Sequence, residues 1–450
     1  MSKLMVSVSG IRGVVGDTLT PENLVQFVAA YGQWLGGGPV VVGRDSRVTG
    51  EMVENVVVGT LQAVGCDIIK IGIVPTPTVQ MAIEKLGAAG GIAVTASHNP
   101  IQWNALKLMN STGMFLDAEQ GEAVIELASQ GKIAWKDWQG MGKVHVYDRA
   151  VADHAEAILA LPYLDVEAIR SRRFRVAVDC VNGAGSTFLP DFLHKLGCEV
   201  VGLNTYPNGL FPHTPEPLPQ NLTVLSKTIE ANRLDIGFAV DPDSDRCAIF
   251  SEKGEPLVEE YTLALAVDFI LSRKKGPVVT NLSTTLAIEK IAERYGVPVF
   301  RTKVGEIHVA KKMKEIGAVI GGEGNGGVIL PDVHLGRDAP VAIALTLQHL
   351  LEFGGTISEL HRRLPQFKMV KKKIEIGATD PDKILSEIQR LHKGENLNTE
   401  DGVKILGADR WVHLRKSNTE PIIRIYSEAP TAEEAEALAG EIERQIQTLQ

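Results

Sequence analysis

The chain has 450 residues, of which 44% are hydrophobic, and it carries a formal net charge of −9 with a pI near 5.7. This acidic balance excludes the broad basic face that nucleic-acid binding requires, although a local cluster of Arg and Lys can still bind a small anion. No stretch approaches the roughly 18 consecutive apolar residues of a membrane span, and the N-terminus lacks the apolar core of a signal peptide. We therefore expect neither a nucleic acid nor a membrane as partner, and a cytoplasmic location.

Short β-branched runs alternate with amphipathic segments along most of the chain, which predicts α/β units with parallel strands. The order strand, polar loop, helix, strand, segment, strand, polar loop occurs three times, beginning near residues 38, 174 and 276. Such repetition predicts three related domains, and the remainder suggests a smaller α+β domain. The predicted domains span residues 1–150, 151–252, 253–365 and 366–450.

The four cysteines show no metal or disulfide pattern. None forms a CxxC pair, so neither a zinc site nor a disulfide framework is indicated. They are Cys66, Cys180, Cys198 and Cys247.

Two loops near the N-terminus place arginines among glycines and serines. They are "SGIRG" (9–13) and "GRDSR" (43–47), with Arg12, Arg44 and Arg47. Guanidinium groups and backbone N–H groups in such loops can hold an anion. A plain turn is the alternative for each.

The motif "TASHNP" (95–100) follows the short apolar run "GGIAV" and contains Ser97 beside His98. One interpretation is a structural turn. A second is a hydrolase nucleophile, but that requires an elbow such as GxSxG, and adjacent side chains diverge, which places His98 badly as a base. The third is a phosphoserine whose phosphate lies against a metal ion.

The motif "DPDSDR" (241–246) follows a second apolar run and supplies Asp241, Asp243 and Asp245. Three carboxylates this close repel one another unless a cation neutralises them, and oxygen ligands suit Mg²⁺ or Ca²⁺. An EF-hand is excluded, because Arg246 stands where the loop requires glycine and strands flank the motif. A solvated acidic turn is the alternative.

Two later motifs could bind sugar and phosphate. "GGEGNGG" (321–327) is not a P-loop, because no GK[ST] follows; Glu323 and Asn325 could bind hydroxyls, with a flexible turn as the alternative. "LRKSNTEPIIR" (414–424) concentrates hydrogen-bond donors that fit a phosphate, with a salt-bridged surface turn as the alternative. Its donors are Arg415, Ser417, Asn418, Thr419 and Arg424.

Taken together, the arginine loop, "TASHNP", "DPDSD", "GEGNG" and "SNTEPIIR" occur in the order found in the α-D-phosphohexomutase family. The chain resembles that family over essentially its whole length. The resemblance implies an α/β fold with four domains around a central cleft. Three would be related α/β domains with mixed, mainly parallel sheets, and the fourth a smaller C-terminal α+β domain.

The resemblance also implies roles for individual residues. Ser97 would carry the transferred phosphoryl group and bind one Mg²⁺ per chain together with Asp241, Asp243 and Asp245. The catalytic set would be Ser97, His98, Lys107 and Arg12, with Lys107 as a proton shuttle if burial lowers its pKa. Glu323 and Asn325 would contact the sugar, and the arginine-rich loop would hold the non-reacting phosphate through Arg415, Ser417, Asn418, Thr419 and Arg424. Arg44 and Arg246 would support the site.

Three departures from the family pattern concern the site. "NALK" (104–107) stands where the family often has Asn-Gly-x-Lys, and Glu323-Gly324-Asn325-Gly326 replaces the common Glu-x-Ser-Gly. In "VGEIHV" (304–309), the family's His or Arg-Tyr is missing after the glycine, which leaves the role of His308 open.

The implied reaction isomerises a hexose phosphate between its 1- and 6-positions through a sugar 1,6-bisphosphate, which is also the activator. The favoured conversion is glucosamine 6-phosphate to glucosamine 1-phosphate, with mannose and glucose phosphates as alternatives. A phosphatase and a non-catalytic sugar-phosphate binding protein remain open. A hinged C-terminal domain would suit reorientation of the intermediate, and we expect a monomer or homodimer.

Overall fold

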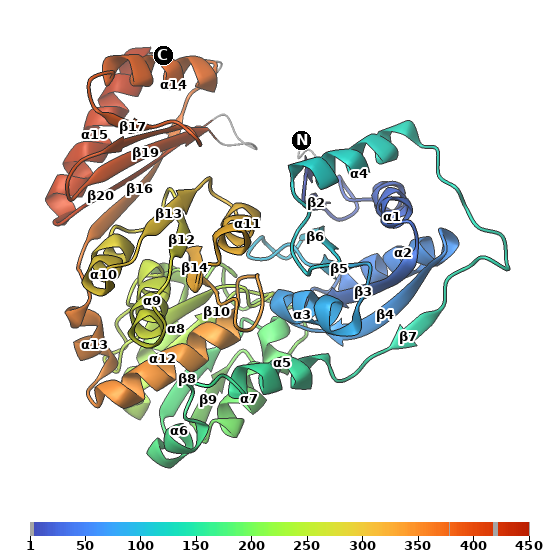
Figure 1. Cartoon of the computed structure of the whole chain (residues 1–450), viewed down its shortest axis with the longest axis horizontal. Coiled ribbons are helices and arrows are strands. Elements are labelled where there is room, and N and C mark those ends of the chain that lie inside the picture. The colour runs from blue at the N-terminus through green and yellow to red at the C-terminus, as the bar shows by residue number, and fades with distance from the viewer. Residues whose placement is uncertain (1–3, 378, 417–421, 450) are drawn as a thin grey trace. The chain divides into compact units, whose positions relative to one another are not determined.

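The computed structural model (Figure 1) describes residues 4–377, 379–416 and 422–449. Its internal contacts divide the chain into two compact units. The first unit comprises Met1–Thr262 and Gly326–Leu360, and the second comprises Leu263–Asn325 and His361–Gln450. Each unit thus combines parts of more than one predicted domain, and the predicted boundaries near 150, 252 and 366 stay a prediction.

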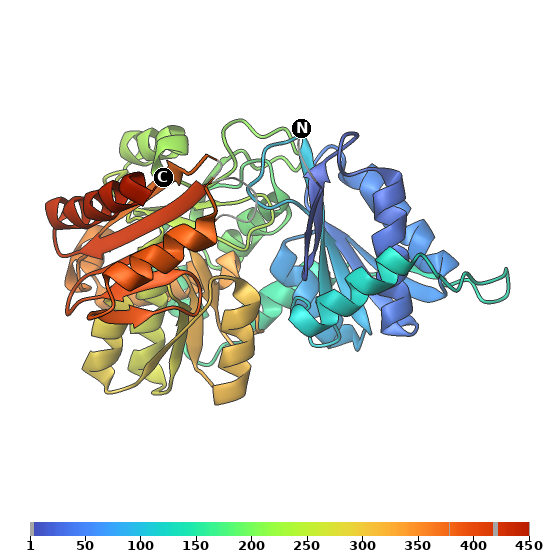
Figure 2. The ribbon, with the colours of Figure 1, turned by 90° about the horizontal axis from the view of Figure 1, so that it is seen from above.

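The first unit begins with a seven-stranded mixed sheet, in the order β1-β2-β6-β5-β3-β4-β7. Helices α1, α2 and α4 cover one face of this sheet and α3 covers the other (Figure 2). The strands are β1 (Met5–Ser7), β2 (Gly10–Val14), β3 (Gly38–Arg44), β4 (Cys66–Ile73), β5 (Gly90–Val94), β6 (Trp103–Asn110) and β7 (Val144–Val146). The helices are α1 (Pro21–Leu35), α2 (Gly50–Ala63), α3 (Thr76–Leu86) and α4 (Ala118–Gln130).

Local sequence explains where two of these helices begin and end. Thr20 and Asn23 form a capping box before α1, and Asp117 and Gln120 form one before α4. In each box, a side chain and a backbone N–H satisfy one another at the helix start. Both helices end at a glycine in the left-handed conformation, which only glycine adopts at little cost.

A second sheet of the first unit has the order β11-β10-β8-β9. Its strand β10 (Ile236–Val240) is buried along its whole length, as expected for a strand covered on both faces. The other strands of this sheet are β8 (Arg175–Asp179), β9 (Glu199–Leu203) and β11 (Cys247–Phe250). The first unit also contains β15 (Gly327–Ile329), which is not part of this sheet. The helices are α5 (Ala150–Leu159), α6 (Val166–Arg172), α7 (Leu189–Lys195), α8 (Thr223–Asn232) and α12 (Ala339–Phe353).

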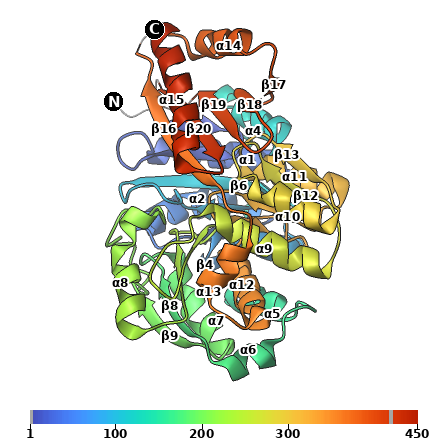
Figure 3. The same ribbon diagram turned by 90° about the vertical axis from the view of Figure 1, so that its left-hand side faces the viewer.

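The second unit contains parallel strands β13-β12-β14 and an antiparallel sheet in the order β16-β20-β19-β18-β17. Helix α15 lies across β16 and β20 (Figure 3). The strands are β12 (Val278–Asn281), β13 (Val299–Thr302), β14 (Ile320–Glu323), β16 (Lys368–Glu375), β17 (Asn396–Asn398), β18 (Val403–Leu406), β19 (Trp411–Lys416) and β20 (Ile422–Ala429). The helices are α10 (Ala287–Tyr295), α11 (Glu306–Ile316), α14 (Pro381–Leu391) and α15 (Ala432–Leu449), while α9 (Glu260–Arg273) and α13 (Ile357–Arg363) cross the unit boundary.

The predicted internal repeat is confirmed by strand order. In each copy, the third strand pairs in parallel with the first, and the first pairs in parallel with the second. The orders are β5-β3-β4, β10-β8-β9 and β14-β12-β13. The predicted α/β class, with three related parts and an antiparallel C-terminal α+β part, is therefore confirmed.

Within the second unit, buried polar contacts join the β12-containing sheet to the C-terminal sheet. Leu286 N–H and Trp411 Nε1–H both donate to Glu428 Oε2, each at 2.7 Å. Lys404 Nζ donates to Leu282 O, and the Lys404 side chain is fully buried over the Trp411 ring. A hinge movement between residues 253–365 and 366–450 would have to break these buried hydrogen bonds. The hinged C-terminal domain stays a prediction.

His413 lies in the same interface, and its burial predicts that the second unit loses stability in acid. Its Nδ1 lies 2.9 Å from Ser283 Oγ and its Nε2 lies 2.7 Å from Asp401 O, and burial lowers its pKa to about 4. Because the unfolded imidazole takes up a proton near pH 6.5, its contribution to stability is lost as pH falls from about 6.5 to about 4, on the order of 3 kcal/mol.

The measurement is the thermal unfolding midpoint between pH 7.5 and 5 for wild type and His413→Gln, which keeps a donor toward Asp401 O. Wild type should lose more stability than the variant over this range. His145→Gln, at an exposed histidine of β7, is the matched control. Equal slopes for wild type and His413→Gln would contradict the prediction.

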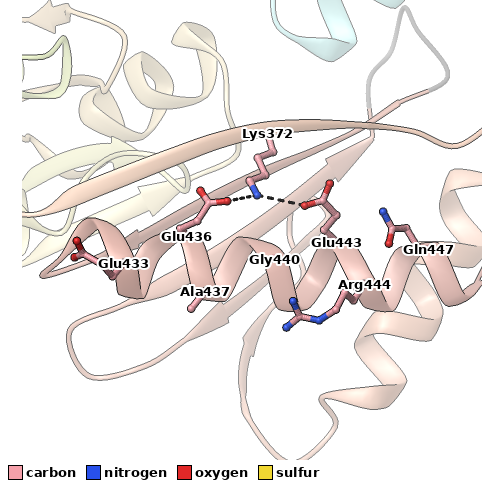
Figure 4. A pocket seen from close by; sticks show the side chains of 8 residues that line it. All are labelled: Lys372, Glu433, Glu436, Ala437, Gly440, Glu443, Arg444 and Gln447. Carbon is pink, nitrogen blue, oxygen red and sulfur yellow. Dashed lines mark hydrogen bonds and ion pairs between the residues drawn. The ribbon is translucent and has the colours of Figure 1, made fainter.

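A lysine of β16 forms ion pairs with two glutamates of α15 at the surface of the second unit. Lys372 Nζ reaches Glu436 and Glu443, the latter at 3.3 Å (Figure 4). These side chains line an open depression of about 620 Å³ with Glu433, Arg444 and their neighbours.

No single helix in the described ranges is long and apolar enough to cross a membrane; α12 and α13 meet the length and composition requirements only as a pair, which is bent by 89°.

Candidate active site

Two loops of the first unit meet beyond the carboxyl ends of their strands. Ser97 follows β5 and Asp241 follows β10, and Ser97 Oγ donates to Asp241 Oδ2 at 2.7 Å although 144 residues separate them. Both side chains are buried, as are those of Asp243 and Asp245. Strand carboxyl ends are the usual ligand sites of open α/β sheets, and the repeat in the sequence predicted a polar loop after each of these two strands.

Ser97 has a left-handed backbone conformation, with φ 49°. Its N–H donates to Thr95 Oγ1 at 3.0 Å, and its carbonyl accepts from Arg47 Nη2 at 2.5 Å. A left-handed non-glycine residue costs of order 1–3 kcal/mol and persists only where its surroundings hold it. The loop therefore presents Ser97 Oγ in a constrained orientation.

Arg47 supplies most of that constraint. All five of its N–H donors are used: Nε on Asp45 Oδ2, Nη1 on Pro100 O and Trp103 O, and Nη2 on Ser97 O and Asn99 O. The expectation that Arg47 could hold an anion is wrong, because a fully buried guanidinium bonded to four backbone carbonyls has no donor left. Arg47 shapes the loop instead.

Arg44 also contacts protein groups. Its Nη1 donates to Asp45 O at 3.2 Å and its Nε lies 3.5 Å from Glu54 Oε2. Both contacts lie beside the Arg47–Asp45 pair. The supporting role of Arg44 stays a prediction.

The three aspartates form a compact carboxylate cluster, with one oxygen of each within 4.8 Å of the others. Burial, followed by Asp245 and Asp243, raises the pKa of Asp241 well above its usual value. Burial alone would raise the pKa of Asp245 as well, but Arg337, Lys107 and Arg246 outweigh it and hold that pKa well below its usual range. One carboxyl group of the cluster is therefore disfavoured as an anion.

The donor set of this cluster fits a divalent cation. Asp243 Oδ1 and Asp245 Oδ1 are buried, and within the described part of the chain neither accepts a hydrogen bond. A buried carboxylate oxygen without a donor is costly, and a hard cation such as Mg²⁺ binds oxygens of this kind. The cluster could therefore hold a metal ion, as the sequence predicted.

Positive side chains surround the carboxylates. Lys107 Nζ lies 2.5 Å from Asp243 Oδ2 and 3.3 Å from Asp245 Oδ2, and Arg246 Nε lies 3.6 Å from Asp245 Oδ1. Arg12 Nη1 donates to Asn99 Oδ1 at 2.7 Å. Arg12 and Lys107 come from the neighbouring antiparallel strands β2 and β6, which explains how residues so distant in sequence share one site.

The surroundings of Lys107 do not give it the lowered pKa that was expected. Burial does lower it, but Asp243 and Asp245 together outweigh burial, and the pKa of Lys107 is raised. With these two carboxylates as partners, Lys107 is an ammonium group. Lys107 was expected to act as a base if burial lowered its pKa, and that condition is not met.

His98 lies closer to Ser97 than the sequence argument allowed. Its Nδ1 is 3.3 Å from Ser97 Oγ, because the left-handed backbone at Ser97 turns two consecutive side chains toward one another. Burial, with Arg246 and Arg12, lowers the pKa of His98 to about 2. The imidazole is therefore neutral, and the Ser97 hydroxyl makes its shorter contact with Asp241.

The remaining predicted residues lie in the second unit. Glu323 Oε1 accepts from Asn281 Nδ2 at 2.8 Å and from Gly305 N–H at 2.9 Å, and Asn325 Nδ2 lies 3.5 Å from Glu323 Oε2. His308 lies exposed in the first turns of α11.

Arg415 and Arg424 face each other in register on β19 and β20, and Arg415 Nε lies 2.9 Å from Asp401 Oδ2. Two like charges on directly opposite positions repel, which an anion would relieve. Ser417, Asn418 and Thr419 lie outside the described residues.

Two residues of the site were not singled out from the sequence. Thr76 Oγ1 donates to Asp243 Oδ2 at 2.6 Å, and Arg337 Nη2 donates to Asp245 Oδ2 at 2.7 Å. Arg337 lies in "GRDAP" (336–340), which repeats the Gly-Arg-Asp of the N-terminal loop; that repetition was the available signal. Thr76 carries no comparable signal.

Comparison with known proteins places the whole chain in one group. Four domain families match it, all described as phosphoglucomutase/phosphomannomutase: alpha/beta/alpha domains I, II and III over residues 3–133, 152–254 and 259–367, and the C-terminal domain over residues 370–445. These matches leave few residues of the chain unassigned.

Relatives and solved structures agree. A probable phosphoglucosamine mutase of Methanopyrus kandleri is 39% identical over 96% of this chain and 95% of that protein. A phosphoglucomutase/phosphomannomutase of Thermococcus kodakarensis is 40% identical over 95% of this chain and 94% of that protein. The crystal structure of a putative phosphomannomutase from Thermus thermophilus matches with a TM-score of 0.85 at 28% identity, over 99% of both chains. The chain therefore belongs to the phosphoglucomutase/phosphomannomutase family and is a phosphohexomutase.

Proposed function

We propose that this enzyme moves a phosphoryl group between the 1- and 6-positions of a hexose phosphate, with Ser97 as the carrier of the transferred group. The observation that supports this proposal is the contact of Ser97 Oγ with Asp241 inside a buried carboxylate cluster. A hydrolase would instead bring its serine closest to a histidine base, whereas here His98 Nδ1 lies 3.3 Å from Ser97 Oγ and Asp241 Oδ2 lies 2.7 Å from it. Here the hydroxyl lies where a phosphate on it would meet a metal ion.

The chain's own residues supply positioning and charge, which dominate phosphoryl transfer. Arg47 holds the Ser97 loop, and Arg12 donates to Asn99 of the same loop. His98 lies beside Ser97, and Arg246 lies beside Asp245. A single Mg²⁺, held by Asp241, Asp243, Asp245 and the phosphate on Ser97, would offset that phosphate's charge of about −1.5 to −2 and polarise the bridging oxygen.

The phosphoryl group on Ser97 passes to the free hydroxyl of the substrate and leaves a sugar 1,6-bisphosphate. The bisphosphate turns around, and its other phosphoryl group returns to Ser97. In each transfer the attacking hydroxyl loses a proton and the leaving oxygen gains one. Because Lys107 is an ammonium group, it is our candidate for donating a proton to the leaving oxygen and then taking up the proton of the attacking hydroxyl. A free sugar 1,6-bisphosphate would restore phosphate to Ser97 and so act as an activator.

The second unit contributes the predicted sugar and phosphate contacts. Glu323 and Asn325 are proposed for the sugar hydroxyls. Arg415 and Arg424, with Ser417, Asn418 and Thr419, are proposed for the phosphate that does not react. The repulsion between Arg415 and Arg424 on paired strands supports an anion there.

We propose glucosamine 6-phosphate as the preferred substrate, converted to glucosamine 1-phosphate. The name of the Methanopyrus relative, a probable phosphoglucosamine mutase, supports this choice. The name of the Thermococcus relative supports mannose and glucose phosphates as the alternative. A monomer or homodimer stays our expectation for the assembly.

The test combines two measurements on the purified protein. Intact-mass and peptide analysis should find phosphate on Ser97, lost on incubation with hexose phosphate. Coupled assays with Mg²⁺ and a bisphosphate primer should show faster turnover of glucosamine 6-phosphate than of mannose 1-phosphate or glucose 1-phosphate. Comparable turnover of all three would contradict the glucosamine assignment.

Two other outcomes would replace the proposal itself. Release of free phosphate faster than isomerisation would identify a phosphatase that uses the same serine. Binding of hexose phosphate without turnover would identify a non-catalytic protein that has kept the fold.

A further inference from the structure

Outside the residues that contact Ser97, three buried side chains of the first unit form a second polar cluster. His154 lies on α5, His334 lies in the loop before α12, and Asp338 caps the start of α12. His154 Nε2 lies 2.7 Å and His334 Nε2 lies 2.9 Å from the same oxygen, Asp338 Oδ2. Asp338 Oδ1 accepts from Val341 N–H at 2.9 Å. The buried carboxylate is thus surrounded by donors.

The spacing of these atoms distinguishes a hydrogen-bonded group from a metal site. A tetrahedral ion with bonds of about 2.0–2.1 Å holds its ligand atoms about 3.3 Å apart. The two contacts to Asp338 are shorter than that and have hydrogen-bond lengths. Each imidazole therefore donates from Nε2 to Asp338 Oδ2.

One arm of the cluster reaches Asp243 through helix α3. Thr78 Oγ1 lies 2.9 Å from His154 Nδ1 and forms a hydrogen bond with the imidazole. Two residues earlier, at the first position of α3, Thr76 donates twice to Asp243, from its N–H to the backbone oxygen at 2.9 Å and from its Oγ1 to Oδ2 at 2.6 Å. Helix α5, which carries His154, packs against both α3 and α12 (Figure 1).

The other arm reaches Asp245 directly along the chain. Arg337 precedes Asp338, and its Nη2 donates to Asp245 Oδ2 at 2.7 Å. Asp338 N–H donates to Val328 O at 2.9 Å, and Arg337 bridges to Ile329. These contacts fix the backbone of residues 337 and 338. From this point the Arg337 side chain reaches Asp245, and the Asp338 side chain reaches His154.

We infer that His154, His334 and Asp338 are positioning residues for the aspartate cluster: they hold the starts of α3 and α12 so that Thr76 and Arg337 keep Asp243 and Asp245 in place to bind the metal ion. The inference rests on the proposed function, because it concerns the proposed metal site.

The physical need for such a cluster follows from charge. Three buried carboxylates within 4.8 Å repel one another, so before a cation binds they tend to turn apart. A donor on one oxygen of a metal-ligating carboxylate fixes its orientation, and removing an outer partner of this kind commonly weakens metal binding 10–100-fold. Thr76 and Arg337 are those donors, and the His154–Asp338–His334 cluster fixes both of them.

The decisive variants interrupt one arm without touching the carboxylates. Thr78→Val removes the hydroxyl that links His154 to α3 and keeps the shape of the side chain, while Thr78→Ser restores the hydroxyl. His334→Phe removes a donor from Asp338 beside Arg337. Thr346→Val is the matched control, since Thr346 is buried on α12 and its hydroxyl donates within that helix, to Ala342 O.

The readout is direct binding of Mn²⁺, followed by the electron paramagnetic resonance signal of the free ion, on the purified full chain. Thr78→Val should weaken Mn²⁺ binding about 3–10-fold, with His334→Phe equal or larger, while Thr78→Ser and Thr346→Val stay within about 2-fold of wild type. Thermal unfolding of each variant shows whether a loss of stability accompanies the effect.

If Thr78→Val binds Mn²⁺ as tightly as Thr346→Val, the positioning role is wrong, and the cluster serves only stability. This conclusion holds even where His334→Phe does not fold. If wild type itself binds no Mn²⁺, or binds it as tightly as Asp241→Asn does, then the proposed metal site is wrong and the inference fails with it. The comparison of wild type with Asp241→Asn thus tells the two failures apart.

Discussion

Ser97→Ala is expected to reduce hexose-phosphate isomerisation by at least about 10⁴-fold, because it removes the oxygen that carries the phosphoryl group through both transfers. The protein should still fold. The substitution removes the hydrogen bond to Asp241 and the longer contact with His98, each worth about 1 kcal/mol or less. It should also still bind Mg²⁺ and substrate, since the three aspartates and the arginines are untouched.

The measurements are the coupled assay and intact mass after incubation with a sugar bisphosphate. Ser251→Ala is the matched control. Ser251 is a buried serine at the end of β11 away from the aspartate loop, and its hydroxyl accepts backbone N–H groups of its own turn. The control should take up phosphate on Ser97 at the wild-type level. Wild-type turnover in Ser97→Ala would rule out the phosphoserine mechanism.

Asp241→Asn should change metal-free stability and metal-dependent stability in opposite directions. Burial and the two neighbouring carboxylates raise the pKa of Asp241 well above its usual value. An acid whose folded pKa is raised destabilises the folded state at neutral pH, where the unfolded carboxyl is ionised. Replacing it with a neutral amide should therefore raise the unfolding midpoint of the metal-free protein.

The same substitution should remove the stabilisation that Mg²⁺ gives. A ligand that binds only the folded state stabilises it by RT ln(1 + [L]/Kd), about 2.7 kcal/mol at a concentration of 100 Kd. Wild type should show this shift when Mg²⁺ is added after chelation, and Asp241→Asn should show little of it. Isomerisation should fall at least about 10²-fold in the variant.

Asp179→Asn provides the control for both effects. Asp179 is a buried carboxylate at the end of β8, the strand beside β10, and it accepts hydrogen bonds from Val181, Asn204 and His213. Its replacement should lower stability with and without Mg²⁺ and leave the Mg²⁺-dependent shift intact. If Asp241→Asn behaves in the same way as Asp179→Asn, the aspartate loop is not a metal site.

Part of the site could be read from the sequence because its chemistry is local. A strand followed by Asp-x-Asp-x-Asp places three carboxylates on one short loop whatever surrounds it, and that alone indicates a cation site. The threefold order of strands and helices likewise follows from patterns that repeat along the chain. The α/β class and the positions of the Ser97 and aspartate loops beyond strand ends were predicted for these reasons.

Other properties of the same residues depended on partners far away in the chain. Arg47 looked like an anion-binding residue, yet its donors are taken by the carbonyls of residues 97–103. Lys107 was expected to become a base on burial, yet Asp243 and Asp245 raise its pKa. In both cases the side chain is the expected type, but the groups that surround it come from other parts of the chain.

By itself, the sequence determined the fold class, the internal repeat and which loops carry the oxygen, amide and guanidinium groups, because these follow from residue type and local spacing. Only the tertiary structure decided which of those groups face each other: Ser97 with Asp241, Arg47 with the serine loop, and Thr76 and Arg337 with the aspartates. The physical reason is that pairing and pKa depend on distances between segments 50 to 167 residues apart in the chain. Such distances are set by packing, and no local pattern encodes them.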